Sequence, residues 1–211
     1  MRLDWTCAII SPEKESSGKG ETGVLAYVFW HWPSEGVEAR HYERDLISFH
    51  ETLAEAEPEG FRGSSTYRIE GAPWVGPGSR GYEDWYLLDG SSALDPLNEV
   101  AVSGKRKSPH DRVAGASAVG GAGGLYGFGS GEPAAVGSGL ATWLTKQRGT
   151  SYGEFYARIE PWTNAPQTSL WRRQLVLGPT PEFCVLGRAG SEFPADLSPV
   201  AVERTPLWPV A

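Results

Sequence analysis

The chain alternates between strand-like and helix-like segments in an order that occurs twice. The first strand is predicted over Val24 to His31 (VLAYVFWH), an uninterrupted run of β-branched and aromatic residues typical of a strand buried on both faces. A helix is predicted between Val37 and Glu57, where apolar residues recur at steps of three and four (Tyr42, Leu46, Phe49, Leu53). The chain therefore opens with a β-α unit.

A β-hairpin is predicted next. Phe61 to Glu70 ends in alternating apolar and polar residues, Tyr82 to Asp89 (YEDWYLLD) is rich in aromatic residues, and Gly71 to Gly81 connects the two through several glycines and prolines. Asp95 followed by Pro96 then resembles an N-cap with proline at the first helical position, which indicates a short helix.

The end of the first half is predicted from weaker signals. Ser103 to Gly121 is expected to be a linker, with its basic run in a solvated loop (Lys105, Arg106, Lys107), and Leu125 to Phe128 is a candidate fourth strand. The glycine-rich stretch from Gly115 to Gly139 suits a linker, a phosphate-binding loop or an edge strand. It contains no GxGxxG followed by a convincing helix and no Walker lysine, which argues against nucleotide binding.

The second half is predicted to repeat the order β, α, β, β, α, β with shorter parts. Its helix runs from Ser151 to Glu160, with Ser151 as N-cap, Glu154 three residues later and Pro161 as its end. The other predicted elements are a strand at Ala141 to Gln147, a hairpin of Thr168 to Leu177 and Glu182 to Leu186 around a turn at residues 178–181, a helical turn at Ala195 to Leu197 and a strand at Val200 to Arg204.

Two βαββαβ units in one chain resemble the dimeric α+β barrel superfamily, here as an internal pseudo-dimer. That superfamily includes the antibiotic-biosynthesis monooxygenases, the ethyl tert-butyl ether degradation proteins and the chlorite dismutases. We therefore expect an α+β fold in which two ferredoxin-like βαββαβ repeats form an internal dimeric α+β barrel. The expected division is an N-terminal segment and loop at residues 1–21, a first repeat at 22–131 and a second repeat at 138–211.

The resemblance implies a small-molecule pocket between two facing sheets. The superfamily hosts cofactor-free oxygenation, haem chemistry, isomerisation and plain binding, so the fold does not select a reaction. We expect an enzyme acting on a small organic molecule by monooxygenase-like chemistry, either cofactor-independent or haem-dependent. The alternatives are a non-catalytic binding or sensor protein and a structural pseudo-dimer with a filled interior. The cofactor is left unknown and a homodimer is left open.

Composition excludes several other classes of protein. A formal net charge of −7 disfavours a nucleic-acid partner, which normally requires a basic face. No stretch approaches the roughly 20 apolar residues that span a bilayer, so we expect no membrane partner and a cytoplasmic location. Cys7 and Cys184 belong to no Cys/His ligand pattern, so neither a metal site nor a disulfide framework is expected.

The candidate catalytic residues are His31, His110 and Asp111. His31 lies between Trp30 and Trp32 at the end of the first predicted strand, where it can act as an acid or base or can pack among rings. His110 beside Asp111 can form a catalytic pair, although adjacent residues usually point apart. His41 and His50, nine residues apart, are expected at surface or flanking positions.

The candidate ligand-binding residues lie on two strands. Within YEDWY, Glu83 and Trp85 share one face and Asp84 and Tyr86 the other, and whichever pair faces a cavity can supply a base. The alternative for this segment is that its carboxylates are charges at the edge of the hairpin and its rings belong to the core.

The other strand contains Trp171, Arg172 and Arg173, and sends one arginine to each face. The inward one must pair with Glu182 or bind an anionic ligand. We expect a pocket between the sheets lined by some of His31, Trp85, Trp171 and Arg173, with Trp32, Glu83 and Arg172 as further ligand-binding residues.

Overall fold

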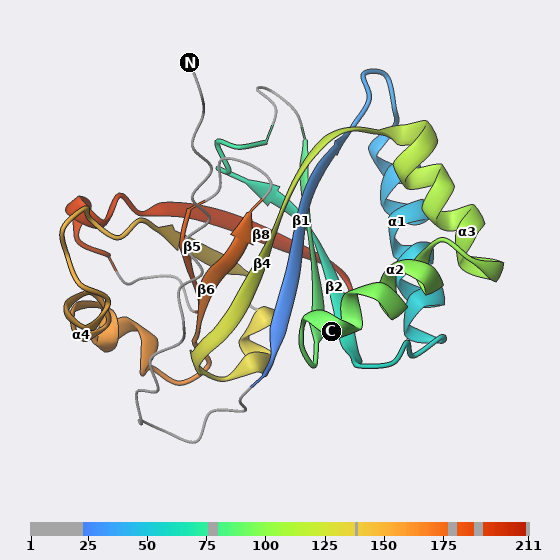
Figure 1. Cartoon of the computed structure of the whole chain (residues 1–211). Coiled ribbons are helices and arrows are strands. Elements are labelled where there is room, and N and C mark those ends of the chain that lie inside the picture. The colour runs from blue at the N-terminus through green and yellow to red at the C-terminus, as the bar shows by residue number, and fades with distance from the viewer. Residues whose placement is uncertain (1–22, 76–79, 138, 177–180, 188–191, 210–211) are drawn as a thin grey trace, which may run out of the picture.

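The computed structural model describes residues 23–75, 80–137, 139–176, 181–187 and 192–209 (Figure 1). The predicted N-terminal segment at 1–21, most of the predicted turn at 178–181 and Cys7 lie outside the described residues. No helix in the described part of the chain is long and apolar enough to cross a membrane.

The first βαββαβ unit is the larger one. It consists of β1 (Leu25–Pro33), α1 (Ala39–Ala54), β2 (Phe61–Glu70), β3 (Gly81–Leu88), α2 (Leu94–Ala101), α3 (Gly104–Asp111) and β4 (Ala118–Gly131). A six-residue π-helical turn, Arg112–Ser117, joins α3 to β4.

The second unit repeats this order with shorter elements. It consists of β5 (Leu140–Leu144), α4 (Tyr152–Thr163), β6 (Ser169–Val176), β7 (Phe183–Leu186), a single 3₁₀ turn (Ala195–Leu197) in place of the second helix, and β8 (Val200–Trp208). Helix α4 begins with the predicted capping box, in which Ser151 and Glu154 each bond the other's backbone N–H.

The eight strands form one closed antiparallel barrel. The strand order is β4-β1-β3-β2 in the first unit and β8-β5-β7-β6 in the second, and the units join through the pairs β2–β8 and β4–β6. The predicted fold of two ferredoxin-like repeats in an internal dimeric α+β barrel is therefore confirmed by the topology of the chain. Helices α1 to α3 cover the outside of the first unit, and α4 lies on the opposite side of the barrel (Figure 1).

Alternation along β1 assigns its side chains to two layers. Val28 and Trp30 point into the barrel core, whereas Leu25 packs in a separate cluster with residues of α1 and α2. His31 lies in the outer layer as well, because it contacts Tyr42 of α1. A functional group on β1 therefore faces either the barrel interior or the helices, according to its position.

The barrel interior is filled by aromatic rings around one buried ion pair. The rings of Trp30, Trp74 and Trp143 meet edge to face with centroids 5.2 to 5.7 Å apart. Glu83 Oε1 lies 3.0 Å from Arg204 Nε, and neither side chain is exposed. Glu83 also accepts hydrogen bonds from the indoles of Trp30 and Trp85, at 2.8 and 2.7 Å.

The glycine-rich stretch contributes to β4 rather than to a phosphate-binding loop. A Cβ at Gly121 would lie 2.8 Å from the ring of Phe29, and one at Gly123 would lie 3.3 Å from the ring of Tyr27. These glycines therefore make room on the outer face for the aromatic side chains of the neighbouring strand β1.

Two local predictions are wrong. Residues 103–121 are not a linker, because the basic run Lys105 to Lys107 lies in α3, which packs against α1 and caps α2 through Arg106 and the carbonyl of Val100 (2.8 Å). Arg112, directly after α3, contacts Asp45 of α1 (3.1 Å). Helix α4 also continues through Pro161 to Thr163. In both places the free energy gained from tertiary contacts exceeds the free energy lost through the low helix propensity of the local residues.

Candidate functional site

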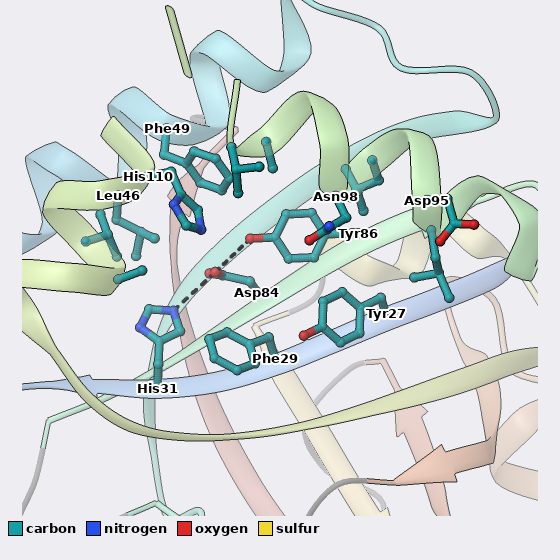
Figure 2. Close-up of a pocket in the computed structure, with 16 residues that line it drawn as sticks. Tyr27, Phe29, His31, Leu46, Phe49, Asp84, Tyr86, Asp95, Asn98 and His110 are labelled. Carbon is teal, nitrogen blue, oxygen red and sulfur yellow. Dashed lines mark hydrogen bonds and ion pairs between the residues drawn. The ribbon is translucent and has the colours of Figure 1, made fainter. Parts of the chain in front are cut away.

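A cavity of about 570 Å³ lies between the outer face of β1 and β3 and the helices α1, α2 and α3 (Figure 2). Its walls are mostly apolar and include Phe29, Leu46, Phe49, Leu97 and Val113. Polar groups gather at two places, a floor on the strands (Tyr27, His31, Asp84, Tyr86) and a rim on the helices (Asp95, Asn98, His110). This size and composition are typical of small-molecule sites.

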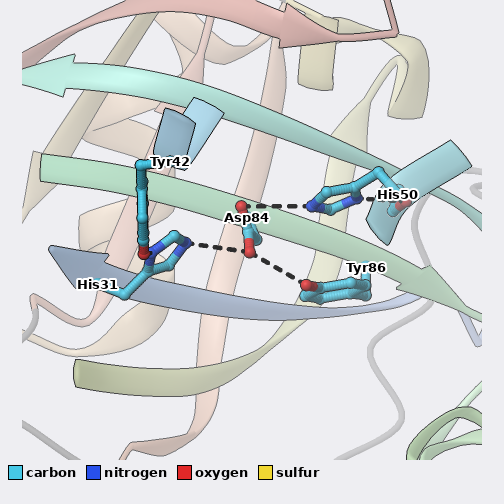
Figure 3. A network of polar contacts seen from close by, with 6 residues as sticks. His31, Tyr42, His50, Asp84 and Tyr86 are labelled. Carbon is cyan, nitrogen blue, oxygen red and sulfur yellow. Dashed lines mark hydrogen bonds and ion pairs between the residues drawn. The ribbon is translucent and has the colours of Figure 1, made fainter. Parts of the chain in front are cut away.

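Asp84 is the centre of a buried chain of polar side chains (Figure 3). Its Oδ2 lies 3.1 Å from His31 Nε2 and accepts a hydrogen bond from the hydroxyl of Tyr86 at 3.0 Å. The other ring nitrogen of His31 hydrogen bonds with the hydroxyl of Tyr42. On the far side, Asp84 Oδ1 lies 3.5 Å from His50 Nε2, and His50 Nδ1 lies 2.7 Å from Ser64 Oγ.

The register of the strands brings these groups together. Asp84 lies opposite Phe29 of β1 and Thr66 of β2, and Tyr86 lies opposite Tyr27 and Ser64. Helix α1 adds one side chain per turn from above, because Tyr42, Leu46 and His50 are spaced four residues apart. The chain of contacts thus joins three strands to one helix.

Asp84 is ionised in the folded protein. Burial by itself would raise the pKa of Asp84, but the charges and hydrogen bonds of His31 and His50 hold it well below the usual range of an aspartate. The neighbouring phenols respond in the opposite sense: burial and the negative charge of Asp84 raise the pKa of Tyr27, Tyr42 and Tyr86. The floor therefore presents one carboxylate surrounded by protonated phenols.

This network predicts a specific acid sensitivity. The pKa of Asp84 is lower in the folded than in the unfolded chain, so its ionised form stabilises the fold above about pH 4 and that contribution is lost as the pH falls further. Between pH 5 and pH 3, the melting temperature of the natural protein should fall more steeply than that of Asp84→Asn. Asp95→Asn, which removes an exposed carboxylate, should show the same dependence of melting temperature on pH as the natural protein. The same dependence in all three proteins would contradict a stabilising, ionised Asp84.

Two of the three predicted catalytic residues lie at this cavity. His31 is on its floor, and His110 lies at its rim in contact with the ring of Phe49. Asp111 follows His110 at the end of α3, where its carboxylate is half exposed and pairs with Lys107. Their catalytic roles stay predictions.

The other predicted residues of the pocket lie elsewhere. Glu83, Trp85 and Trp171 are in the barrel interior, and Trp32 packs against the same core. His31 contacts α1 on the outer face, whereas Trp85 and Trp171 lie in the barrel interior, so these three side chains do not line one cavity together. A pocket between the sheets lined by some of His31, Trp85, Trp171 and Arg173 stays a prediction. Strand alternation places His31 and Asp84 on the outer face, opposite to Glu83 and Trp85.

The two adjacent arginines lie far from this cavity in the sequence and in the fold. The guanidinium of Arg172 stacks on the ring of Tyr152 in α4, 4.0 Å from its centroid. The backbone N–H of Arg173 donates to the carbonyl of Glu182 at 2.8 Å, whereas the carboxylate of Glu182 accepts from the hydroxyl of Tyr152 at 2.7 Å. In the barrel interior, the guanidinium of Arg204 lies beside the carboxylate of Glu83.

Sequence analysis missed His50, which is fully buried rather than a surface residue. The signal was present, because His50 continues the four-residue spacing of Tyr42 and Leu46 along the buried face of α1. Asp84 and Tyr86 were recognised as one face of their strand, and the structure shows that this face, not that of Glu83 and Trp85, borders the cavity.

The donor groups at the cavity do not suit haem. Both ring nitrogens of His31 are engaged, by Tyr42 and Asp84, which leaves His110 at the rim as the histidine in the lining that could offer an axial nitrogen. The described lining residues include no lysine or arginine to pair with propionates. Among the described residues, no three His, Cys, Asp or Glu side chains are grouped as a metal site.

Comparison with known proteins supplies no closer assignment. No protein-family model matches the sequence, and no curated protein matches it. Similar solved structures include an anthrone oxidase-like protein (TM-score 0.48, 12% identity, covering 87% of this chain and 73% of the other) and a putative chlorite dismutase (0.45, 12%, 87% and 95%). A dimeric protein of unknown function with a ferredoxin-like fold from Bacteroides fragilis is also similar (0.34, 12%, 50% and 97%).

Proposed function

We propose that this protein is a cofactor-independent enzyme that binds a small, largely apolar or aromatic molecule between β1, β3 and the helices α1 to α3, and transfers a proton to or from it. One observation carries the proposal: a cavity with mostly apolar walls is floored by an ionised carboxylate that two imidazoles and a phenol contact. Buried, coupled titratable groups at a cavity are typical of acid–base sites.

The proposed roles follow from the contacts. Asp84 orients His31 through the 3.1 Å contact to Nε2, and an imidazole is the side chain that most often serves as a general acid or base. Tyr86, kept protonated by its raised pKa, donates its hydroxyl proton to Asp84, so its oxygen can accept a hydrogen bond from the bound molecule. His110 at the rim would assist binding.

The finer part of the proposal is a monooxygenase-like reaction with O₂ as co-substrate. One oxygen atom replaces two hydrogens on the deprotonated carbon as a carbonyl, the other oxygen leaves with those hydrogens as water, and the substrate supplies the electrons. Cofactor-independent chemistry is chosen over haem chemistry because the ring nitrogens of His31 are already engaged. A Soret band in the purified protein would contradict this choice.

Filling the cavity should abolish ligand retention. Ala101 is the last residue of α2 and lines the cavity, so Ala101→Phe places a ring in the space that a ligand would occupy. Native mass spectrometry of protein purified from cell extract should detect a small-molecule adduct on the natural protein and none on this variant.

Ala54→Phe is the matched control for this experiment. Ala54 is the last residue of α1 and is exposed, so this variant adds the same ring at a helix end without entering the cavity. It should retain the adduct. An adduct that persists on Ala101→Phe, or a natural protein that carries none, would count against the cavity as the binding site.

A further inference from the structure

The charge of the cavity lining restricts the head group of the ligand. Asp84 contributes a buried carboxylate to the floor and Asp95 an exposed one to the rim, and no lysine or arginine occurs among the described lining residues. The groups near the cavity that can carry a positive charge are histidines: His31 and His50 are already paired with Asp84, and His110 lies at the rim. An anionic ligand would therefore meet a carboxylate without a fixed positive charge to bind it.

The aromatic rings of the floor favour the same kind of ligand. Tyr27 and Tyr86 stack with centroids 5.8 Å apart, and Phe29 stacks on His31 at 5.4 Å. The faces of such rings carry negative electrostatic potential and attract cations and polarised N–H or O–H groups. The negative charge of Asp84 also raises the pKa values of Tyr27 and Tyr86, which is consistent with a negative potential at the floor.

We infer that the ligand of this cavity presents an uncharged or positively charged hydrogen-bond donor, such as a hydroxyl or a protonated amine, to Asp84 and Tyr86, and that carboxylate, sulfate and phosphate ligands are rejected. This inference rests on the proposed function, because it assumes that the cavity is the binding site. It adds the chemical class of the molecule that the site selects.

Three probes with one ring system test this selectivity: 2-naphthol, 2-naphthylmethylammonium and 2-naphthoate. Their apolar bodies match, so the head group alone changes from neutral donor to cation to anion. Isothermal titration calorimetry of the natural protein at pH 7.5 should give 2-naphthoate a dissociation constant at least tenfold higher than those of the other two probes. Binding of 2-naphthoate as tight as that of 2-naphthol would overturn the inference.

Two carboxylate variants test whether Asp84 causes the discrimination. Asp84→Asn should reduce the ratio of the dissociation constants of 2-naphthoate and 2-naphthol at least fivefold, because the negative charge at the floor is removed. Asp95→Asn should reduce the same ratio about twofold, since this carboxylate lies at the exposed rim. If Asp84→Asn does not fold, the inference is tested with Asp95→Asn alone. An unchanged ratio of the two dissociation constants in that variant would overturn the inference.

The outcomes separate this inference from the proposed function. Binding of all three probes with equal affinity, abolished by Ala101→Phe, would leave the cavity as the binding site and overturn the charge selectivity alone. Failure of every probe to bind the natural protein and both asparagine variants would count against the cavity itself, and against this inference with it.

Discussion

Replacing Arg204 by methionine is expected to destabilise the protein by about 3 to 5 kcal/mol, because the substitution leaves Glu83 as an uncompensated charge in the barrel interior. Neither side chain of this pair is exposed, and the guanidinium also stacks on the ring of Tyr67, 3.6 Å from its centroid. Urea unfolding followed by tryptophan fluorescence measures the loss.

The double variant Arg204→Met/Glu83→Gln identifies the cause. Glutamine removes the charge and keeps one oxygen, which can accept from one of the two indoles that now bond Oε2 (Trp30) and Oε1 (Trp85), so part of the lost stability should return. Arg172→Met is the matched control: this arginine is partly exposed and stacks on Tyr152 outside the barrel, so its loss should cost less than about 1 kcal/mol. A double variant no more stable than Arg204→Met would show that the loss of stability comes from the methionine and not from the unpaired charge of Glu83.

Replacing His31 by glutamine should lower kcat/KM for the compound retained in the cavity by about 10² to 10⁴-fold, the range expected when a general acid or base is removed. Glutamine can still contact Tyr42 or Asp84 but cannot exchange a proton near neutral pH. Turnover is followed by mass spectrometry of the released product, with circular dichroism as the check on folding.

His41→Gln is the control for this substitution. His41 lies on the exposed side of α1, so the variant makes the same chemical change without reaching the cavity and should keep natural turnover. A folded His31→Gln protein with undiminished turnover would exclude His31 as the base. A retained compound that the natural protein does not convert would favour the non-catalytic binding or sensor alternative.

Sequence analysis did not find Arg204, an arginine buried in the barrel interior. A guanidinium in the barrel interior requires a compensating charge, and the structure provides one for Arg204 in Glu83. Arg172 and Arg173 drew attention because they are adjacent on one strand. Arg204 lies in β8, whose sequence has no feature that marks one face as buried. Pairing of β8 with β2 and β5 decides which of its faces points into the barrel.

The sequence by itself determined the order of the elements and the repeat. Those signals are local: the periodicity of α1, the capping box at Ser151 and the aromatic run of β1 each lie within one segment. The fold class followed from their order, as the closed barrel shows. Helix α3 was missed because the contacts that stabilise it come from α1 and α2.

Only the tertiary structure decided where the candidate site lies. Alternation shows that Asp84 and Glu83 point in opposite directions, but not which face meets the helices and which meets the barrel interior. That choice depends on barrel closure through β2–β8 and β4–β6, and on α1 placing Tyr42 and His50 over the outer face of β3. Because these contacts join residues far apart in the chain, the buried chain around Asp84 exists only once β1, α1, β2 and β3 have come together.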